Sequence, residues 1–183
     1  MKKAFIIALG EEVNHVETIN GSMVIYCGVG KINAAIGAYT LIQKGATEII
    51  NLGSCGSKQH RLGEIIKVGK VYQDIDGTPI SPYGHTPFED ESHCITLDEL
   101  SPYTCFTTDY FFDHAQHSKY APAYLAMIKA CSVFDMELYA IAKTCKLHGV
   151  DLASYKWVSD DGDFTKWKEN CEISSKKVIE MLS

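Results

Sequence analysis

The segment IINLGSCGS, residues 49–57, joins an apolar run directly to a glycine-rich stretch. The run predicts a buried strand over residues 47–52, and the following glycines predict a turn at which a ligand could come close to the backbone. Upstream, MVIYC (23–27) predicts a second buried strand, which leads into GVGK (28–31) and a helix over 32–44. Strand, glycine turn, helix and strand in this order are typical of a βαβ unit.

The rest of the chain continues this alternation. Further strands are predicted over residues 4–9, 103–107 and 152–158, with one or two more in 64–76. Helices are predicted over 135–148 and, as a closing amphipathic helix, over 167–182. Residues 77–102 hold four of the five prolines and predict a long loop. The sequence therefore predicts an α/β fold.

Nearly every predicted strand ends in glycines or carboxylates. Glu11 and Glu12 follow the first strand, and residues 28–31, 53–57 and 160–163 follow three others. Ligands of open α/β sheets bind beyond the carboxyl ends of the strands. These four segments are therefore the candidate binding residues.

The composition excludes several classes of protein. The chain has 183 residues, which fits one domain over 1–183, and it is 46% hydrophobic and 22% charged, as globular proteins are. Its net charge of −6 provides no basic surface for nucleic acid or for an anionic membrane. The N-terminal apolar run is too short to span a bilayer, and two glutamates follow it in place of a signal-peptide cleavage site. We expect a cytoplasmic protein with a small-molecule partner.

Cysteine and histidine are not spaced as in a metal site. The seven cysteines contain no C-x-x-C pair and are odd in number, so they predict buried, reduced thiols. His85, His93, His114 and His117 are spread along the chain, where a surface or loop role is favoured over metal ligation. No metal and no organic cofactor is expected.

Each motif alone also has a purely structural interpretation. The GVGK turn could hold an anion on a helix N-terminus, but it matches neither a P-loop nor the dinucleotide fingerprint, and a plain tight turn also explains it. Residues 53–57 could be a structural turn, and their order excludes a nucleophile elbow. Glu11 and Glu12 could be the acidic first turn of a helix. Residues 160–163 could be a solvated Asx turn, and their spacing is not that of a calcium loop.

Taken together and in order, six segments resemble the purine nucleoside phosphorylase/uridine phosphorylase superfamily, and within it the branch of the methylthioadenosine/S-adenosylhomocysteine nucleosidases. They are IIALGEEV (6–13), GVGKINAA (28–35), IINLGSCG (49–56), DYFF (109–112), DME with AIA (135–137 and 140–142) and VSD (158–160). The resemblance implies a three-layer α/β/α fold with a mixed central sheet flanked by helices. It also implies cleavage of the N-glycosidic bond of a purine nucleoside such as a 5′-thioadenosine.

The resemblance assigns two catalytic residues. Asp160, assisted at the base by Ser159, corresponds to the family's acid, which protonates N7 of the purine and so improves the leaving group. Such an acid requires a raised pKa near neutral pH. Glu12 corresponds to the glutamate that activates water in the nucleosidases.

The resemblance also implies a set of substrate-binding residues. The pair Met136 and Glu137 would hold the ribose hydroxyls, and Val29 would line the ribose pocket. Phe111 would stack on the adenine, and backbone groups at Phe112 would read the edge of the base. The glycine-rich segment would contribute Ser54.

The nucleophile separates hydrolysis from phosphorolysis. Phosphorylases of this family carry an arginine where this chain has Asn51, and Arg61 is the only arginine in the sequence. A carboxylate at Glu12 repels phosphate, so the sequence favours a nucleosidase. A phosphate-dependent phosphorylase and a non-catalytic nucleoside-binding protein are the alternatives.

Several departures from the family pattern surround the expected pocket rim. The stretch between Val16 and Met23 is too short for the family's extra hairpin, and the part after residue 163 is trimmed. Lys156 replaces an arginine, and Tyr110 is bulky where a small residue is usual. The 5′-substituent of the nucleoside therefore stays open. The resemblance further implies a homo-oligomer, with a dimer as the first expectation.

Overall fold

The computed structural model describes residues 2–89 and 93–183. Its strands are β1 (Lys3–Ile7), β2 (Thr18–Ile19), β3 (Ser22–Tyr26), β4 (Glu48–Gly56), β5 (Ile65–Lys67), β6 (Lys70–Gln73), β7 (Cys94–Thr96), β8 (Thr104–Thr107), β9 (Val133–Asp135) and β10 (Asp151–Asp160). Its helices are the 3₁₀ helices η1 (Gly10–Val13) and η2 (His114–Lys119) and the α-helices α1 (Lys31–Gln43), α2 (Pro122–Ala130), α3 (Leu138–His148), α4 (Phe164–Asn170) and α5 (Ser175–Met181).

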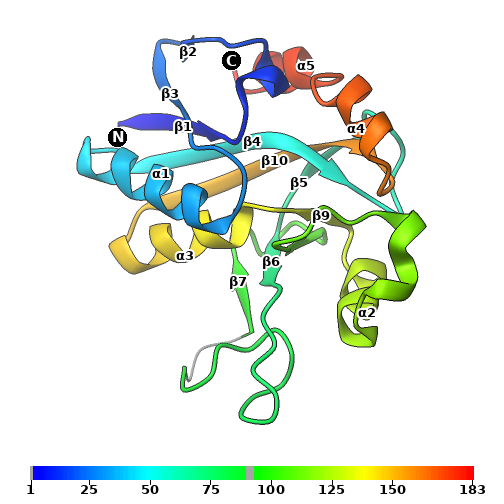
Figure 1. Cartoon of the computed structure of the whole chain (residues 1–183). Coiled ribbons are helices and arrows are strands. Elements are labelled where there is room, and N and C mark those ends of the chain that lie inside the picture. Colours follow the sequence, from blue (N-terminus) through cyan, green and yellow to red (C-terminus); the bar gives the residue numbers. More distant parts are fainter. Residues whose placement is uncertain (1, 90–92) are drawn as a thin grey trace.

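The described strands form one mixed sheet, whose centre is a parallel set in the order β3, β1, β4 and β10 (Figure 1). At its far end β4 also pairs with β9, through Gly56 and Phe134. The strands β9, β8 and β6 form a second parallel set, and β5 pairs with the outer side of β10. Because the strands of the central set run parallel, their carboxyl ends meet at one edge of the sheet.

Helices cover both faces of the sheet, because successive side chains of a strand point to opposite faces. Ile6 packs with Leu41 of α1 beneath the sheet, whereas its neighbour Phe5 packs with Val178 of α5 on the other face. Figure 1 shows α1 and α3 on one side of the sheet and α4 and α5 on the other. The predicted three-layer α/β/α fold with a mixed central sheet is confirmed.

The glycine-rich segment after residue 52 is strand rather than turn. β4 continues through Gly56, so the predicted strand end at residue 52 is wrong. A Cβ on Gly56 would lie 2.0 Å from Cε2 of Phe134, whose ring packs directly against the strand. The glycine is therefore needed for close packing between β4 and β9.

Two predicted helices have different bounds in the structure. The helix predicted from residue 135 begins at Leu138, because Asp135 belongs to β9 and its side chain accepts a hydrogen bond from the Leu138 N–H. The closing helix is two helices, α4 and α5. It is interrupted where the Cys171 carbonyl accepts a hydrogen bond from the indole of Trp157.

Several smaller elements, among them β9 and η2, were not predicted. α2 begins with Pro122 and packs Tyr124 and Ile128 in one cluster with Phe106 of β8 and Phe134 of β9. β7 lies within the predicted loop 77–102, of which residues 90–92 are outside the described part. β2 pairs with β3 around Asn20 and Gly21, both left-handed, so this short segment forms a small hairpin of its own.

Within residues 2–89 and 93–183, no helix combines the length and the hydropathy that crossing a membrane requires.

Candidate active site

A pocket of about 480 Å³ lies at the edge where the carboxyl ends of the central strands meet. Its lining comes from the segments after β1, β3, β8 and β9, from the ends of β4 and β10, and from α4. The pocket brings together eight of the nine predicted site residues: Glu12, Val29, Ser54, Phe111, Phe112, Met136, Glu137 and Asp160. The ninth, Ser159, is fully buried behind Asp160.

Glu12 presents a buried carboxylate at the pocket. Oε1 accepts hydrogen bonds from the backbone N–H and the hydroxyl of Ser54, both at 2.6 Å, and Oε2 accepts one from the Leu9 N–H at 3.1 Å. Burial raises the pKa of Glu12, and the Ser54 bonds and the charge of Lys156 oppose this rise. Glu11 and Glu12 both lie in the first turn of η1, but Glu11 is exposed and only Glu12 faces the pocket.

Asp160 ends β10, just after an irregularity in the pairing with β4. Its Oδ2 lies 2.8 Å from the hydroxyl of Ser159, which is also 3.1 Å from the Cys55 carbonyl. Its Oδ1 accepts a hydrogen bond from the Gly162 N–H at 2.8 Å, which forms an Asx turn. Burial raises the pKa of Asp160, although these hydrogen bonds act in the opposite direction. Asp160, the predicted acid, is therefore also the first residue of the turn predicted over residues 160–163.

Glu137 lies directly before α3 and reaches across to the glycine turn after β3. Its Oε1 accepts a hydrogen bond from the Gly30 N–H at 2.9 Å, and its Oε2 one from the Met136 N–H at 3.3 Å. Gly30 has a φ of 95°, which favours glycine. The Gly30 N–H of the GVGK turn, which one interpretation predicted to hold an anion, is therefore bonded to a side chain of the same protein. Burial, and then the charge of Asp135, raise the pKa of Glu137.

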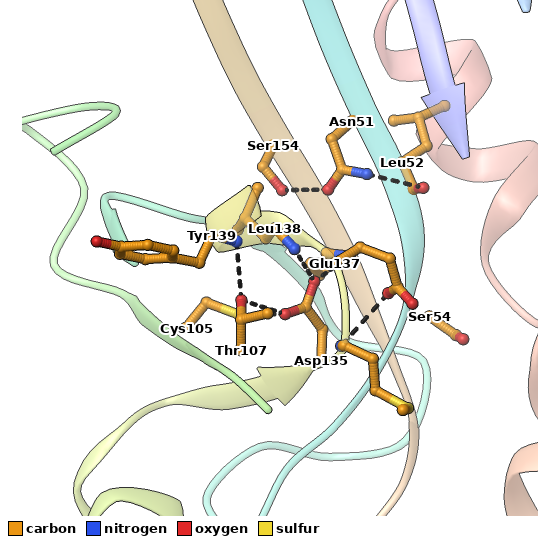
Figure 2. Close-up of polar contacts among 12 residues, drawn as sticks. Asn51, Leu52, Ser54, Cys105, Thr107, Asp135, Glu137, Leu138, Tyr139 and Ser154 are labelled. Carbon is orange, nitrogen blue, oxygen red and sulfur yellow. Dashed lines mark hydrogen bonds and ion pairs between the residues drawn. The ribbon is translucent and has the colours of Figure 1, made fainter. Parts of the chain in front are cut away.

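Asp135, itself part of the pocket lining, joins three elements, and Figure 2 shows its contacts with Thr107 and Leu138. Its Oδ1 accepts a hydrogen bond from the hydroxyl of Thr107 in β8 at 2.6 Å. Its Oδ2 accepts one from the Leu138 N–H at 2.9 Å and lies 2.8 Å from Nζ of Lys156 in β10. The Leu138 bond satisfies one of the N–H groups that have no partner within α3. These contacts fix the short segment that carries Glu137.

Lys156 is a buried cation between carboxylates. Its side chain is 2% exposed and that of Asp135 1%. A Cβ on Gly53, which pairs with Lys156 across the strands, would lie 3.2 Å from Oε1 of Glu12 and 3.4 Å from Nζ of Lys156. The absence of a side chain at Gly53 thus lets the Lys156 ammonium approach Glu12 as well as Asp135. The sequence identified this lysine as a departure but did not predict its partners.

The aromatic side of the pocket includes two residues that sequence reasoning missed. Phe164 and Trp167 of α4 stack on each other, with ring centroids 5.6 Å apart and planes 22° apart. Both meet the ring of Phe111 edge to face. The indole N–H of Trp167 donates to the hydroxyl of Ser54 at 3.0 Å. The helical pattern of residues 167–182 indicated only a packed helix and contained no signal for this contact.

Comparison with known proteins identifies related sequences. A family model described as the phosphorylase superfamily matches residues 12–183. A 5′-methylthioadenosine/S-adenosylhomocysteine nucleosidase from an Exiguobacterium species is 27% identical, over 86% of this chain and 77% of that protein.

Solved structures share the fold at low sequence identity. A Colwellia psychrerythraea 5′-methylthioadenosine/S-adenosylhomocysteine nucleosidase in complex with adenine has a TM-score of 0.82 at 21% identity, covering 100% of this chain and 94% of that one. The native futalosine hydrolase of Helicobacter pylori has a TM-score of 0.81 at 18% identity, covering 98% and 94%. At these identities the likeness shows the fold alone.

Proposed function

Because the chain belongs to the phosphorylase superfamily, we propose that it is a purine nucleosidase that hydrolyses the N-glycosidic bond of an adenine nucleoside. The Exiguobacterium relative is named as a nucleosidase of this kind, and it matches over most of its own length. The Colwellia structure of the same fold holds adenine. A 5′-thioadenosine is the substrate class that these names support.

The charge of the pocket lining carries this proposal. Its charged side chains are all carboxylates, and among the described lining residues there is no lysine or arginine. A phosphate ion requires cationic partners, and carboxylates repel it. A neutral nucleoside and a water molecule meet no such repulsion, and the cationic sugar of the transition state is stabilised by negative charge.

The arginine position of the phosphorylases supports the same choice. Asn51 lies there, and its side chain accepts a hydrogen bond from Ser154 at 2.9 Å (Figure 2). It also donates one to the carbonyl of Ile6 at 3.2 Å. Both partners are in the neighbouring strands β10 and β1, and Asn51 does not line the pocket. The residue is therefore occupied within the sheet.

In the proposed reaction Asp160 is the general acid. Its protonated carboxyl donates to N7 of the purine, and Ser159 orients it through the contact at 2.8 Å. Protonation makes the base a better leaving group, so the bond between C1′ and the base nitrogen breaks as the base takes up its electron pair. Burial supports this role, because it raises the pKa and keeps the acid protonated at higher pH.

Glu12 is the general base in the same reaction. Its carboxylate takes a proton from a water molecule whose oxygen forms the new bond to C1′. The products are the free base and a sugar with a hydroxyl at C1′, so one water is consumed and the proton count balances. The fixed orientation of Glu12 by Ser54 and Leu9 supports this assignment.

The remaining lining residues bind the nucleoside. We assign the ribose hydroxyls to Glu137 with Met136, and the ribose pocket to Val29. Phe111 stacks on the adenine, with backbone groups at Phe112 at its edge. Their support is their common position in the pocket. On the family resemblance we also propose a homo-oligomer, with a dimer as the first expectation, which light scattering on the purified protein measures.

The test is adenine release from 5′-methylthioadenosine with and without phosphate. We expect the same rate in both buffers. Asp160→Asn and Glu12→Gln should each lower kcat by about 10²–10⁴-fold while calorimetry still detects adenine binding. Strict dependence on phosphate would instead make the protein a phosphorylase. Equally slow release by the wild type and Asp160→Asn, with adenine bound by both, would make it a non-catalytic binding protein.

A further inference from the structure

α4 places one hydrogen-bond donor, the indole of Trp167, next to the serine that contacts the proposed general base, Glu12. Asp163 caps the helix by accepting from the Thr165 N–H at 2.9 Å, and Asn170 donates to the Ser159 carbonyl at 3.4 Å. The helix is therefore attached to the end of β10. Its half-buried Trp167 lines the pocket, and the indole Nε1 lies 3.0 Å from Oγ of Ser54.

The chemistry of indole gives this contact a direction. An indole N–H can only donate, so Oγ of Ser54 must accept from Trp167. The hydroxyl proton of Ser54 is then available for the other partner of Oγ, which is Oε1 of Glu12 at 2.6 Å. The ionised carboxylate can only accept, so both neighbours of Oγ favour the same direction of the Ser54 hydroxyl. The chain of bonds runs from Trp167 through Ser54 to Glu12.

This chain also distinguishes the two oxygens of Glu12. Oε1 accepts from both the hydroxyl and the backbone N–H of Ser54, whereas Oε2 accepts only from the Leu9 N–H. A carboxylate oxygen has about two acceptor sites. Oε2 therefore keeps a lone pair for a proton from water, and the orientation of the whole group is set from the Oε1 side.

We propose that Trp167 is a positioning residue for Glu12, the general base. Its indole N–H, through the Ser54 hydroxyl, holds the Glu12 carboxylate in the orientation that accepts the proton of water at Oε2. The inference rests on the proposed function. Stacking on Phe164 and the edge-to-face contact with Phe111 hold the indole plane in place. Because Phe111 is also the residue proposed to stack on the adenine, the same aromatic cluster contacts the substrate and, through Ser54, is linked to the general base Glu12.

The test variant is Trp167→Phe, which keeps an aromatic ring in the cluster but removes the donor together with part of the ring. We expect kcat to fall about tenfold with KM changed less than about twofold. The acid limb of the kcat/KM profile should move to higher pH, because the ionised Glu12 loses support. The charged groups that face Glu12, Lys156 of β10 and Glu137 before α3, are unchanged in this variant.

Trp157→Phe is the matched control. It also removes an indole hydrogen bond, but that bond goes to the Cys171 carbonyl and lies outside the pocket. We expect this variant to melt at a lower temperature with wild-type kcat and an unchanged acid limb. A fall in kcat equal to that of Trp167→Phe would overturn the proposal, because loss of packing would then explain both.

A double-mutant cycle with Ser54→Ala separates the relay from general packing. In the Ser54→Ala background, Trp167→Phe should lower kcat by less than about twofold, because the relay is already broken. A tenfold fall in that background would overturn the proposal. If the wild type releases no adenine, the proposed function is overturned, and this inference with it. An active wild type matched by Trp167→Phe in kcat and pH profile overturns only this inference.

Discussion

At the scale of single residues, the three pocket carboxylates with proposed roles have different partners. Glu12 accepts hydrogen bonds from a hydroxyl and two backbone N–H groups, and it faces a buried ammonium. Glu137 accepts from two backbone N–H groups. Asp160 accepts from one N–H and one hydroxyl, and the neighbouring charge of Asp161 raises its pKa further. One kind of side chain can therefore serve as base, ribose ligand and acid at the same pH.

In the proposed reaction, the pH dependence follows from the roles assigned to two of these groups. Glu12 must be ionised, so activity rises as the pH passes its raised pKa, above the usual range of a glutamate. Asp160 must be protonated, so activity falls as the pH passes its own raised pKa, above the usual range of an aspartate. We expect a bell-shaped profile of kcat/KM against pH, measured by adenine release.

Ser54→Ala tests the assignment of the acid limb to Glu12. The hydroxyl of Ser54 stabilises the ionised carboxylate, so its removal should raise the pKa of Glu12 and move the acid limb to higher pH. Ser57→Ala is the control, because that hydroxyl donates to the Ser132 carbonyl outside the pocket. An acid limb that stays in place in Ser54→Ala would assign it to another group.

At the scale of secondary-structure elements, the junction of β4 and β9 depends on Gly56. Gly56→Ala would place a methyl group 2.0 Å from the ring of Phe134, so the strands must separate or the ring must move. We expect a loss of about 1–3 kcal/mol in the free energy of unfolding, measured in urea. In the Phe134→Leu background the same change should cost less. Equal costs in both backgrounds would contradict the steric explanation.

The ion pair between β10 and β9 gives a second prediction at this scale. Lys156→Met leaves the buried carboxylate of Asp135 without its cation, and we expect a cost of about 3–5 kcal/mol in the free energy of unfolding. Adding Asp135→Asn removes the unpaired charge. The double variant should therefore be more stable than Lys156→Met alone when both are unfolded in urea. A less stable double variant would show that the unpaired charge of Asp135 does not cause the loss of stability in Lys156→Met.

Sequence patterns predicted the interiors of the elements better than their ends. The apolar runs 23–27 and 32–44 correspond to β3 and α1. The predicted burial of the first run is wrong, because every residue of β3 is half-buried or exposed. The ends depend on bonds between distant residues. α3 begins where Asp135 accepts from Leu138, and the last helix divides where Trp157 donates to the Cys171 carbonyl. No local pattern contains such a pairing.

At the scale of the whole molecule, the site draws on segments from residue 8 to residue 167. The family resemblance located eight lining residues, because their motifs follow strands whose carboxyl ends meet. The contribution of α4 could not be predicted, since it depends on how the part after residue 163 folds back over β4. Lys156 was visible as a change of residue, but its position between Asp135 and Glu12 depends on the register of β10 and β4.

Ligand binding should stabilise the whole fold, because the pocket joins segments from most of the chain. Adenine at 100 times its Kd should add about 2.7 kcal/mol to the free energy of unfolding and raise Tm by several degrees. Asp160→Asn should show a comparable rise, since adenine binding does not need the proton transfer. Phosphate at the same concentration should leave Tm unchanged. A rise of Tm with phosphate alone would favour the phosphorylase.

The position of β10 has a consequence for how the protein is made. β10 is the last strand in the chain, yet it pairs with β4 in the middle of the sheet and with β5 on its other side (Figure 1). A ribosome produces β4 long before β10, so one side of β4 has no partner for most of translation. An unpaired strand edge is a template for association with other chains. We therefore expect nascent chains released before residue 151 to aggregate, whereas those that include β10 can close the sheet.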